Sequence, residues 1–174
     1  MGDILTDVEY VIFQKEAEND KKINEILVTY PYSIVLTQDC DLEQDYGCRN
    51  TLKKERNSED KLITSILLCP VFNAADFKSG QHLSDIGLIS SPWGGELWSS
   101  IKSNNHKRFY FLNQDSISKL PDLIIDFKNF FTISSDSLYD VYEEKHCTSV
   151  KNLFREDISH RFAHYNSRIG LPKL

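Results

Sequence analysis

Residues 62–72 read LITSILLCPVF, the most apolar stretch in this chain of 174 residues. A short apolar run of this kind, rich in Ile, Leu and Val, is typical of a strand buried within a sheet. We therefore expect residues 62–72 to form the central strand of the fold. The remaining elements are those that can pair with this strand or pack against it.

The segment upstream predicts a second strand. Residues 26–37 (ILVTYPYSIVLT) are rich in Val, Ile, Thr and Tyr, which strands favour. Pro31 cannot donate a backbone hydrogen bond, so it indicates an edge or a bulge near the start of this strand. The charged segment 14–22 is expected to be a surface loop or a frayed helical turn, and segment 47–60 a solvent-exposed loop. Similar patterns predict further strands at residues 2–13, 107–113 and 122–133.

Apolar residues at helical spacing mark the C-terminal segment. They recur at intervals of four, four, three and four residues: Phe154, Ile158, Phe162, Tyr165 and Ile169. This spacing predicts an amphipathic helix with Phe162 buried against the sheet. Ser149 or Asn152 can cap its start. Gly170 and Pro172 can stop it.

The order of these elements predicts an α+β fold. Short helices are expected after Asn73, which can cap one, and over residues 96–103. Five or six strands in a chain of this size favour a small, strongly curved antiparallel sheet or a partly open barrel. We expect a single domain over residues 1–174, with a barrel-like core at about 1–133 and a C-terminal helical element at about 150–170.

Composition and charge restrict the function classes. The chain has no apolar run of about 18 residues, and its N-terminus carries acids where a secretory signal carries lysines. We therefore expect a cytoplasmic protein without a membrane segment. The net charge of −6 disfavours general nucleic-acid binding, because phosphate contacts need clustered positive charge. The four cysteines form no CxxC pair and are expected to be reduced thiols, with Cys69 in the core.

Residues 37–45 read TQDCDLEQD and follow the apolar run at 33–36. If the strand continues, Asp39 and Asp41 lie on one face about 7 Å apart, and Cys40 lies on the other. Two such carboxylates can share a divalent metal ion, act in catalysis, or cap a turn through backbone amides. A reactive Cys40 is disfavoured, because the flanking aspartates raise the pKa of a thiol.

The terminal helix carries a basic stripe of Arg161, His164 and Arg168, spaced three and four residues apart. This stripe can face solvent, bind phosphate or nucleic acid, or pair with the acids of TQDCDLEQD. We predict that at least one of those acids pairs with Arg161 or Arg168, because carboxylates at the end of an apolar strand need a partner. Trp93, in a turn, either packs on the sheet or contributes to a partner surface.

Three short motifs carry a resemblance to a known family. Gly2-Asp3-Ile4, the run 33–37 and the run 66–71 together resemble the opening of the PemK/MazF-like toxins. Over roughly the first 72 residues, the resemblance implies an SH3-like barrel and an RNA-cleaving ancestry. The chain departs from the family where Tyr30-Pro31-Tyr32 replaces an expected arginine, and where Thr37 is followed by acids that would repel RNA phosphates.

The chain also resembles bacterial proteins that share a TQxCDL-type motif and a terminal helix ending in RIGLP. These resemblances imply an accessory or interaction module of a bacterial multi-gene system, such as a toxin or defence system. Such a module would bind a protein partner, without catalytic activity or a cofactor. The alternative is a metal-dependent nuclease or other hydrolase that uses Asp39 and Asp41, with Cys40 as a further candidate and Arg161 or His164 assisting.

Overall fold

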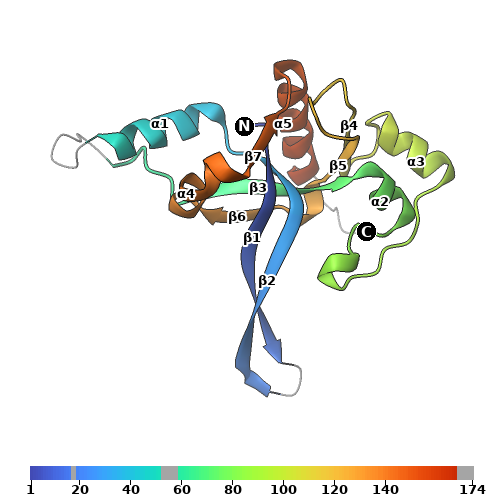
Figure 1. Cartoon of the computed structure of the whole chain (residues 1–174), viewed down its shortest axis with the longest axis horizontal. Coiled ribbons are helices and arrows are strands. Elements are labelled where there is room, and N and C mark those ends of the chain that lie inside the picture. Colours follow the sequence, from blue (N-terminus) through green and yellow to red (C-terminus); the bar gives the residue numbers. More distant parts are fainter. Residues whose placement is uncertain (17–18, 52–58, 168–174) are drawn as a thin grey trace, which may run out of the picture.

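A seven-stranded antiparallel sheet organises the computed structural model, which describes residues 1–16, 19–51 and 59–167 (Figure 1). The strand order is β4-β5-β3-β2-β1-β7, and β6 pairs with β3 beside β5. The α+β class and the antiparallel sheet are confirmed, but the sheet does not close into a barrel. The strands are β1 (Asp3–Glu16), β2 (Asn19–Val35), β3 (Ser65–Asn73), β4 (Phe109–Leu112), β5 (Leu123–Asp126), β6 (Phe131–Ser134) and β7 (His146–Ser149).

β3 is the central strand, as its apolar sequence predicts. One edge pairs with β2, and the other pairs with β6 along its first half and with β5 along its second. Alternate residues of β3 enter two apolar cores on opposite faces of the sheet: Ile66, Leu68 and Phe72 on one, Cys69 and Val71 on the other. Cys69 is a fully buried free thiol, as expected.

The single strand predicted at residues 122–133 is wrong, because a 3-10 turn, η3 (Phe127–Asn129), divides it into β5 and β6. Asp126 causes the break. Its carboxylate accepts a hydrogen bond from the Lys128 amide at 3.1 Å and pairs with Arg108. The turn buries Phe127 and lets both short strands pair with successive parts of β3.

The described residues form five α-helices. They are α1 (Asp39–Asn50), α2 (Ala74–Ser79), α3 (Gly95–Lys102), α4 (Ser135–Lys145) and α5 (Asn152–Asn166). Asn73 caps α2 by accepting a hydrogen bond from the Ala75 amide at 2.8 Å, as predicted. The predicted caps of α5 are wrong: its N-cap is Lys151, without a side-chain bond. Gly170 and Pro172 lie outside the described residues.

The two cores take different helices. Phe77 of α2, Ile101 of α3 and Leu138 of α4 enter the first core. Ile158 and Tyr165 of α5 enter the second, so the C-terminal helix packs on the opposite face of the sheet. Phe162 is only half-buried, with its ring 5.7 Å from that of Phe127, and Ile158 makes the fully buried contact.

The loop predicted at residues 14–22 is wrong, because β1 and β2 run on as a long antiparallel hairpin. We call residues 8–16 and 19–30 the arm. It projects well beyond the body of the protein (Figure 1). The arm begins where Asp7, with φ +50°, and Pro31 interrupt the pairing between Thr6–Tyr32 and Val8–Tyr30. Beyond this break, in the described part of the chain, β1 and β2 pair with each other alone.

Two further boundaries differ from the sequence prediction. β7 pairs with β1 through Asp3, Ile4 and Leu5, so the sheet extends past residue 133. The polar segment predicted as a loop at 47–60 begins with the last turns of α1, and residues 52–58 lie outside the described part.

Candidate functional site: a pocket between two helices and a projecting arm

TQDCDLEQD does not continue the strand, and the predicted arrangement of its acids is wrong. β2 ends at Val35, and α1 begins at Asp39 after the N-cap Gln38. A helix turns by about 100° per residue, so Asp39 and Asp41 point to different sides rather than along one face. Both acids lie in the first turn, where negative charge favours the positive end of the helix dipole.

Asp39 pairs with the terminal helix, but through a different arginine from those predicted. Its Oδ2 lies 3.2 Å from Nη1 of Arg155, and its Oδ1 contacts the N-terminal ammonium of Met1. Arg161 instead pairs with Asp157, with Nε 3.1 Å from Oδ2, and donates to the Asn104 carbonyl. Arg168 lies outside the described residues. Arg155 is the partner of Asp39 because the first turn of α5 faces the start of α1.

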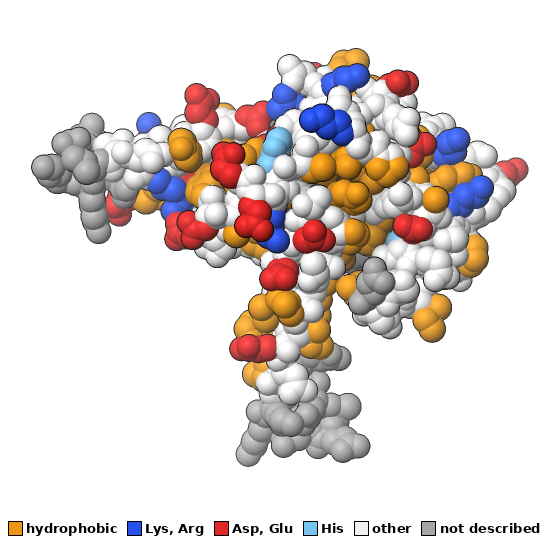
Figure 2. Space-filling view, viewed as in Figure 1, with side chains coloured by type: hydrophobic (Ala, Val, Ile, Leu, Met, Phe, Trp, Pro, Cys, Tyr) orange, Lys and Arg blue, Asp and Glu red, His pale blue; other side chains and the backbone are white. Residues whose placement is uncertain are grey.

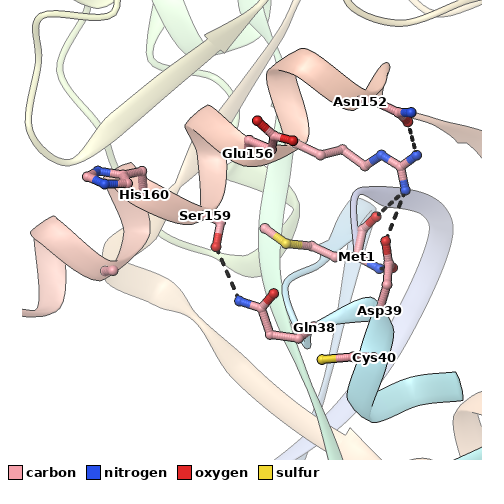
Figure 3. Close-up of a pocket in the computed structure, with 10 residues that line it drawn as sticks. Met1, Gln38, Asp39, Cys40, Asn152, Glu156, Ser159 and His160 are labelled. Atoms are coloured by element: carbon pink, nitrogen blue, oxygen red, sulfur yellow. Dashed lines mark hydrogen bonds and ion pairs between the residues drawn. The ribbon is translucent and has the colours of Figure 1, made fainter. Parts of the chain in front are cut away.

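A pocket of about 650 Å³ opens between the starts of α1 and α5 (Figure 3). Gln38 crosses one side of it, donating from Nε2 to Ser159 Oγ at 3.3 Å. Arg155 also donates to the Met1 carbonyl and to Asn152, so its guanidinium is held on several sides. The other lining residues are Asp39, Cys40, Glu156, His160 and Ala163.

The predicted catalytic and binding residues do not converge in this pocket. Asp39 and Cys40 line it, whereas Asp41, Arg161 and His164 do not. Cys40 is exposed, and its Sγ lies 3.7 Å from Oδ1 of Asp41. Across residues 1–16, 19–51 and 59–167, no three or more His, Cys, Asp or Glu side chains gather so as to hold a metal ion.

Of the acids in TQDCDLEQD, Asp45 is the buried one, and the sequence prediction did not single it out. It is fully buried, and its carboxylate accepts from the Ile63 amide at 2.8 Å and from Arg49 Nε at 2.7 Å. Burial by itself would raise the pKa of Asp45, but these hydrogen bonds outweigh it and lower the pKa. Arg49 continues to Ser135 Oγ at 2.7 Å, so the pair joins α1 to α4. The four-residue spacing of Asp45 and Arg49 was the available signal.

Trp93 packs on the first core. Its ring stacks on Phe77, with centroids 5.5 Å apart, and meets Phe109 edge-on at 5.2 Å. This is the packing alternative of the sequence prediction. Because these contacts cover much of the ring, Trp93 presents little surface to a partner.

The arm presents an apolar surface that the sequence prediction missed (Figure 2). Val8, Tyr10, Val28 and Tyr30 face the first core, and the residues between them face outward. The register pairs Val11 with Leu27 and Phe13 with Glu25. Directly opposed and alternate residues share a face in an antiparallel pair. One outward face of the arm therefore carries four exposed apolar side chains, which we call the stripe: Val11 (47%), Phe13 (70%), Ile23 (59%) and Leu27 (59%).

Glu25 interrupts the stripe. It lies on the same face as Ile23 and Leu27, opposite Phe13, and is exposed. In the part of the chain that the structure describes, no hydrogen bond or ion pair engages its carboxylate. The period-two alternation at residues 8–13 and 23–30 was the sequence signal for this arm.

No protein-family model, no curated protein and no solved structure matches this chain. The resemblance to PemK/MazF-like toxins and the bacterial multi-gene setting therefore stay predictions. Among the residues that the structure describes, none of the helices combines the length and the apolar character needed to cross a bilayer.

Proposed function

We propose that this protein is an interaction module without catalytic activity, which binds a protein partner through the arm. The observation that carries this proposal is the stripe: four large apolar side chains stand 47–70% exposed on one face of a projecting hairpin. Contiguous exposed apolar patches are typical of interaction surfaces. We further propose that it acts in a bacterial multi-gene system in the cytoplasm, where its four free cysteines would stay reduced.

The length of the arm supports the same proposal. A two-stranded hairpin by itself is marginally stable in water, because it has no core to bury its apolar face. Among the described side chains of the arm, those that enter the first core lie at its base: Val8, Tyr10, Val28 and Tyr30. A partner that covers the stripe would bury Phe13 and Leu27, each of which contributes about 1.5–3 kcal/mol when fully buried.

The charge of the arm favours a protein over a nucleic acid. The sequence of the arm contains four acids and three bases: Glu9, Glu16, Asp20 and Glu25 against Lys15, Lys21 and Lys22. The two acids on the face of the stripe are Glu9 and Glu25. Acids beside the stripe would repel phosphates, and the chain as a whole carries −6.

The hydrolase alternative has less support from the geometry. Asp39 already pairs with two cations, Arg155 and the ammonium of Met1, and both compete with a metal ion for its carboxylate. Asp41 points to another side of α1, outside the pocket. A pair of carboxylates acting together needs both groups on one reacting centre.

The proposal is tested by photo-crosslinking in the bacterium that makes the protein. A photoreactive amino acid replaces Val11 in the full chain. We expect one protein to crosslink, and we expect Phe13→Ser with Leu27→Ser to reduce the yield by roughly tenfold or more. The matched control is Leu153→Ser, which alters a 76% exposed apolar side chain on α5, the helix of the second core, and should leave the yield unchanged.

A thermal melt accompanies each variant to show that the body stays folded. An unchanged yield in the Phe13 and Leu27 double variant would contradict the proposal, as would the absence of any crosslinked protein. A crosslink to nucleic acid would point to the other class of partner.

A further inference from the structure

One edge of the arm is open to a further strand. β2 pairs with β3 only through Tyr32–Val35. Over Glu25–Tyr30, in the described part of the chain, only β1 pairs with β2, so the outer edge of β2 has no strand beside it. Exposed strand edges present unpaired backbone N–H and C=O groups that readily accept another chain.

This edge lies beside a groove. A hollow of about 450 Å³ follows the consecutive residues Ile26–Thr29 of β2, and Ile86 forms its opposite wall. Asp7 and Pro31 close it at the base of the arm. Pro31 has no backbone N–H, so strand pairing along this edge would end there. The groove therefore follows the edge for about the length of a short strand.

The opposite edge of the arm is partly covered at its base. Lys145 at the end of α4 donates from Nζ to the Asp7 carbonyl at 2.7 Å, and its own carbonyl accepts from Thr6 Oγ1 at 3.4 Å. Residues of α4 and β6 also line a hollow beside Val8–Val11 of β1. In the described part of the chain, the edge of β1 over Val8–Phe13 also lacks a further strand, but α4 contacts its base, whereas the edge of β2 is followed by the groove from Ile26 to Thr29.

Charge indicates what kind of segment fits. A strand added beside β2 would place alternate side chains next to Ile23, Glu25 and Leu27. Apolar residues suit the two outer positions, and a Lys or Arg suits the position next to Glu25. A second copy adding through its own β2 edge would bring its Glu25 toward this Glu25, and this repulsion disfavours self-association there.

We infer that an extended segment of the partner protein adds as a strand along the outer edge of β2, with a basic side chain beside Glu25. This inference rests on the proposed function, because it names how the partner is recognised. Main-chain hydrogen bonds provide affinity in this mode, and side chains at alternate positions provide specificity.

The probe is a synthetic peptide of about six residues, a common strand length, with Val and Thr alternating around a central Lys. Matched peptides carry Glu at the centre, or Pro in place of one Val. Each is titrated into the isotope-labelled full chain and followed by amide NMR. We expect the Lys peptide to shift amides of Glu25–Tyr30 first, and to bind roughly fivefold more tightly than the Glu peptide at low salt.

Glu25→Lys should reverse this preference. Its matched control is Glu9→Lys, which alters an exposed acid on the same face of the arm but on β1 instead of β2, and which should leave the preference unchanged. The Pro peptide should bind weakly, because proline removes a donor from the added strand.

The inference is overturned if no peptide binds, if the shifts fall on β1 instead of β2, or if Lys and Glu peptides bind alike. Concentration-dependent dimerisation through the arm, measured by light scattering, would overturn it in favour of a second copy. The proposed function is tested separately. It is contradicted if the crosslinking yield at residue 11 is unchanged by Phe13→Ser with Leu27→Ser, regardless of the peptide results.

Discussion

At the scale of single residues, Asp45 illustrates how one carboxylate joins distant segments. It is fully buried and receives the Ile63 amide and the Arg49 guanidinium. A buried charge is costly unless it is paired and hydrogen-bonded, and here both conditions are met. Removing it would take from Arg49 its buried carboxylate and leave it the exposed carboxylate of Asp136.

We predict that Asp45→Asn lowers the free energy of unfolding by about 3 kcal/mol near neutral pH, because the amide cannot neutralise Arg49. The pKa of Asp45 is lowered in the folded state, so its contribution is complete above its ordinary value of 3.8 and is lost as the pH falls through the folded pKa. The difference between wild type and variant should therefore shrink in acid. Urea denaturation of wild type and variant, at neutral pH and at a pH below 3.8, measures this difference.

The control for this prediction is Asp41→Asn, since Asp41 is exposed and bonds only weakly to Cys40. It should change the free energy of unfolding by less than about 0.5 kcal/mol. A loss at Asp45 that stays the same in acid would mean that shape rather than charge holds α1 in place.

At the scale of elements, the contact between α1 and α5 depends on Asp39 and Arg155. We predict that Asp39→Ala and Arg155→Ala each destabilise the fold and that the double variant loses less than their sum. The coupling should be about 0.5–1 kcal/mol, because the Asp39 side chain is 65% exposed and that of Arg155 28%. Chemical denaturation of the four proteins measures this cycle.

The matched cycle uses Asp41 and Arg161, one of the acid–arginine pairs that the sequence prediction allowed. Arg161 pairs with Asp157 instead, within its own helix, so this cycle should be additive. If Asp41 and Arg161 are coupled while Asp39 and Arg155 are additive, the described contact between the starts of α1 and α5 is wrong.

At the scale of the whole molecule, stability and recognition are divided between the body and the arm. We predict that Ile158→Ala lowers the free energy of unfolding by about 3 kcal/mol, because this side chain is fully buried in the second core. Leu27→Ser should change it by less than about 0.5 kcal/mol, because Leu27 is 59% exposed on the arm. Thermal and urea unfolding of the two variants measure the contrast.

If Leu27→Ser destabilises the protein as much as Ile158→Ala, the stripe is needed for folding, and its exposure no longer argues for a partner. Equal, small effects would instead show that α5 contributes little to the second core.

The sequence by itself determined the elements with strong local signals. Residues 65–73 form the central strand because a continuous apolar run can be buried on both faces. α5 packs one apolar face against the second core because the spacing of its apolar residues matches the helical period. Asn73 caps α2 because its side chain reaches the Ala75 amide two residues on.

The candidate site depended on tertiary structure. α1 has few apolar residues, chiefly Leu42 and Tyr46, so local pattern did not distinguish a helix from the end of a strand. The choice of Arg155 over Arg161 depends on which turn of α5 meets α1, and one helical turn moves a side chain by about 5.4 Å. The arm's alternation is visible in the sequence, but alternation alone does not say which strands continue past the sheet. The tertiary structure shows that β1 and β2 continue. Their pairing is interrupted at Asp7 and Pro31, and β3 pairs with β2 through Tyr32–Val35, so beyond that point β1 is the described partner of β2.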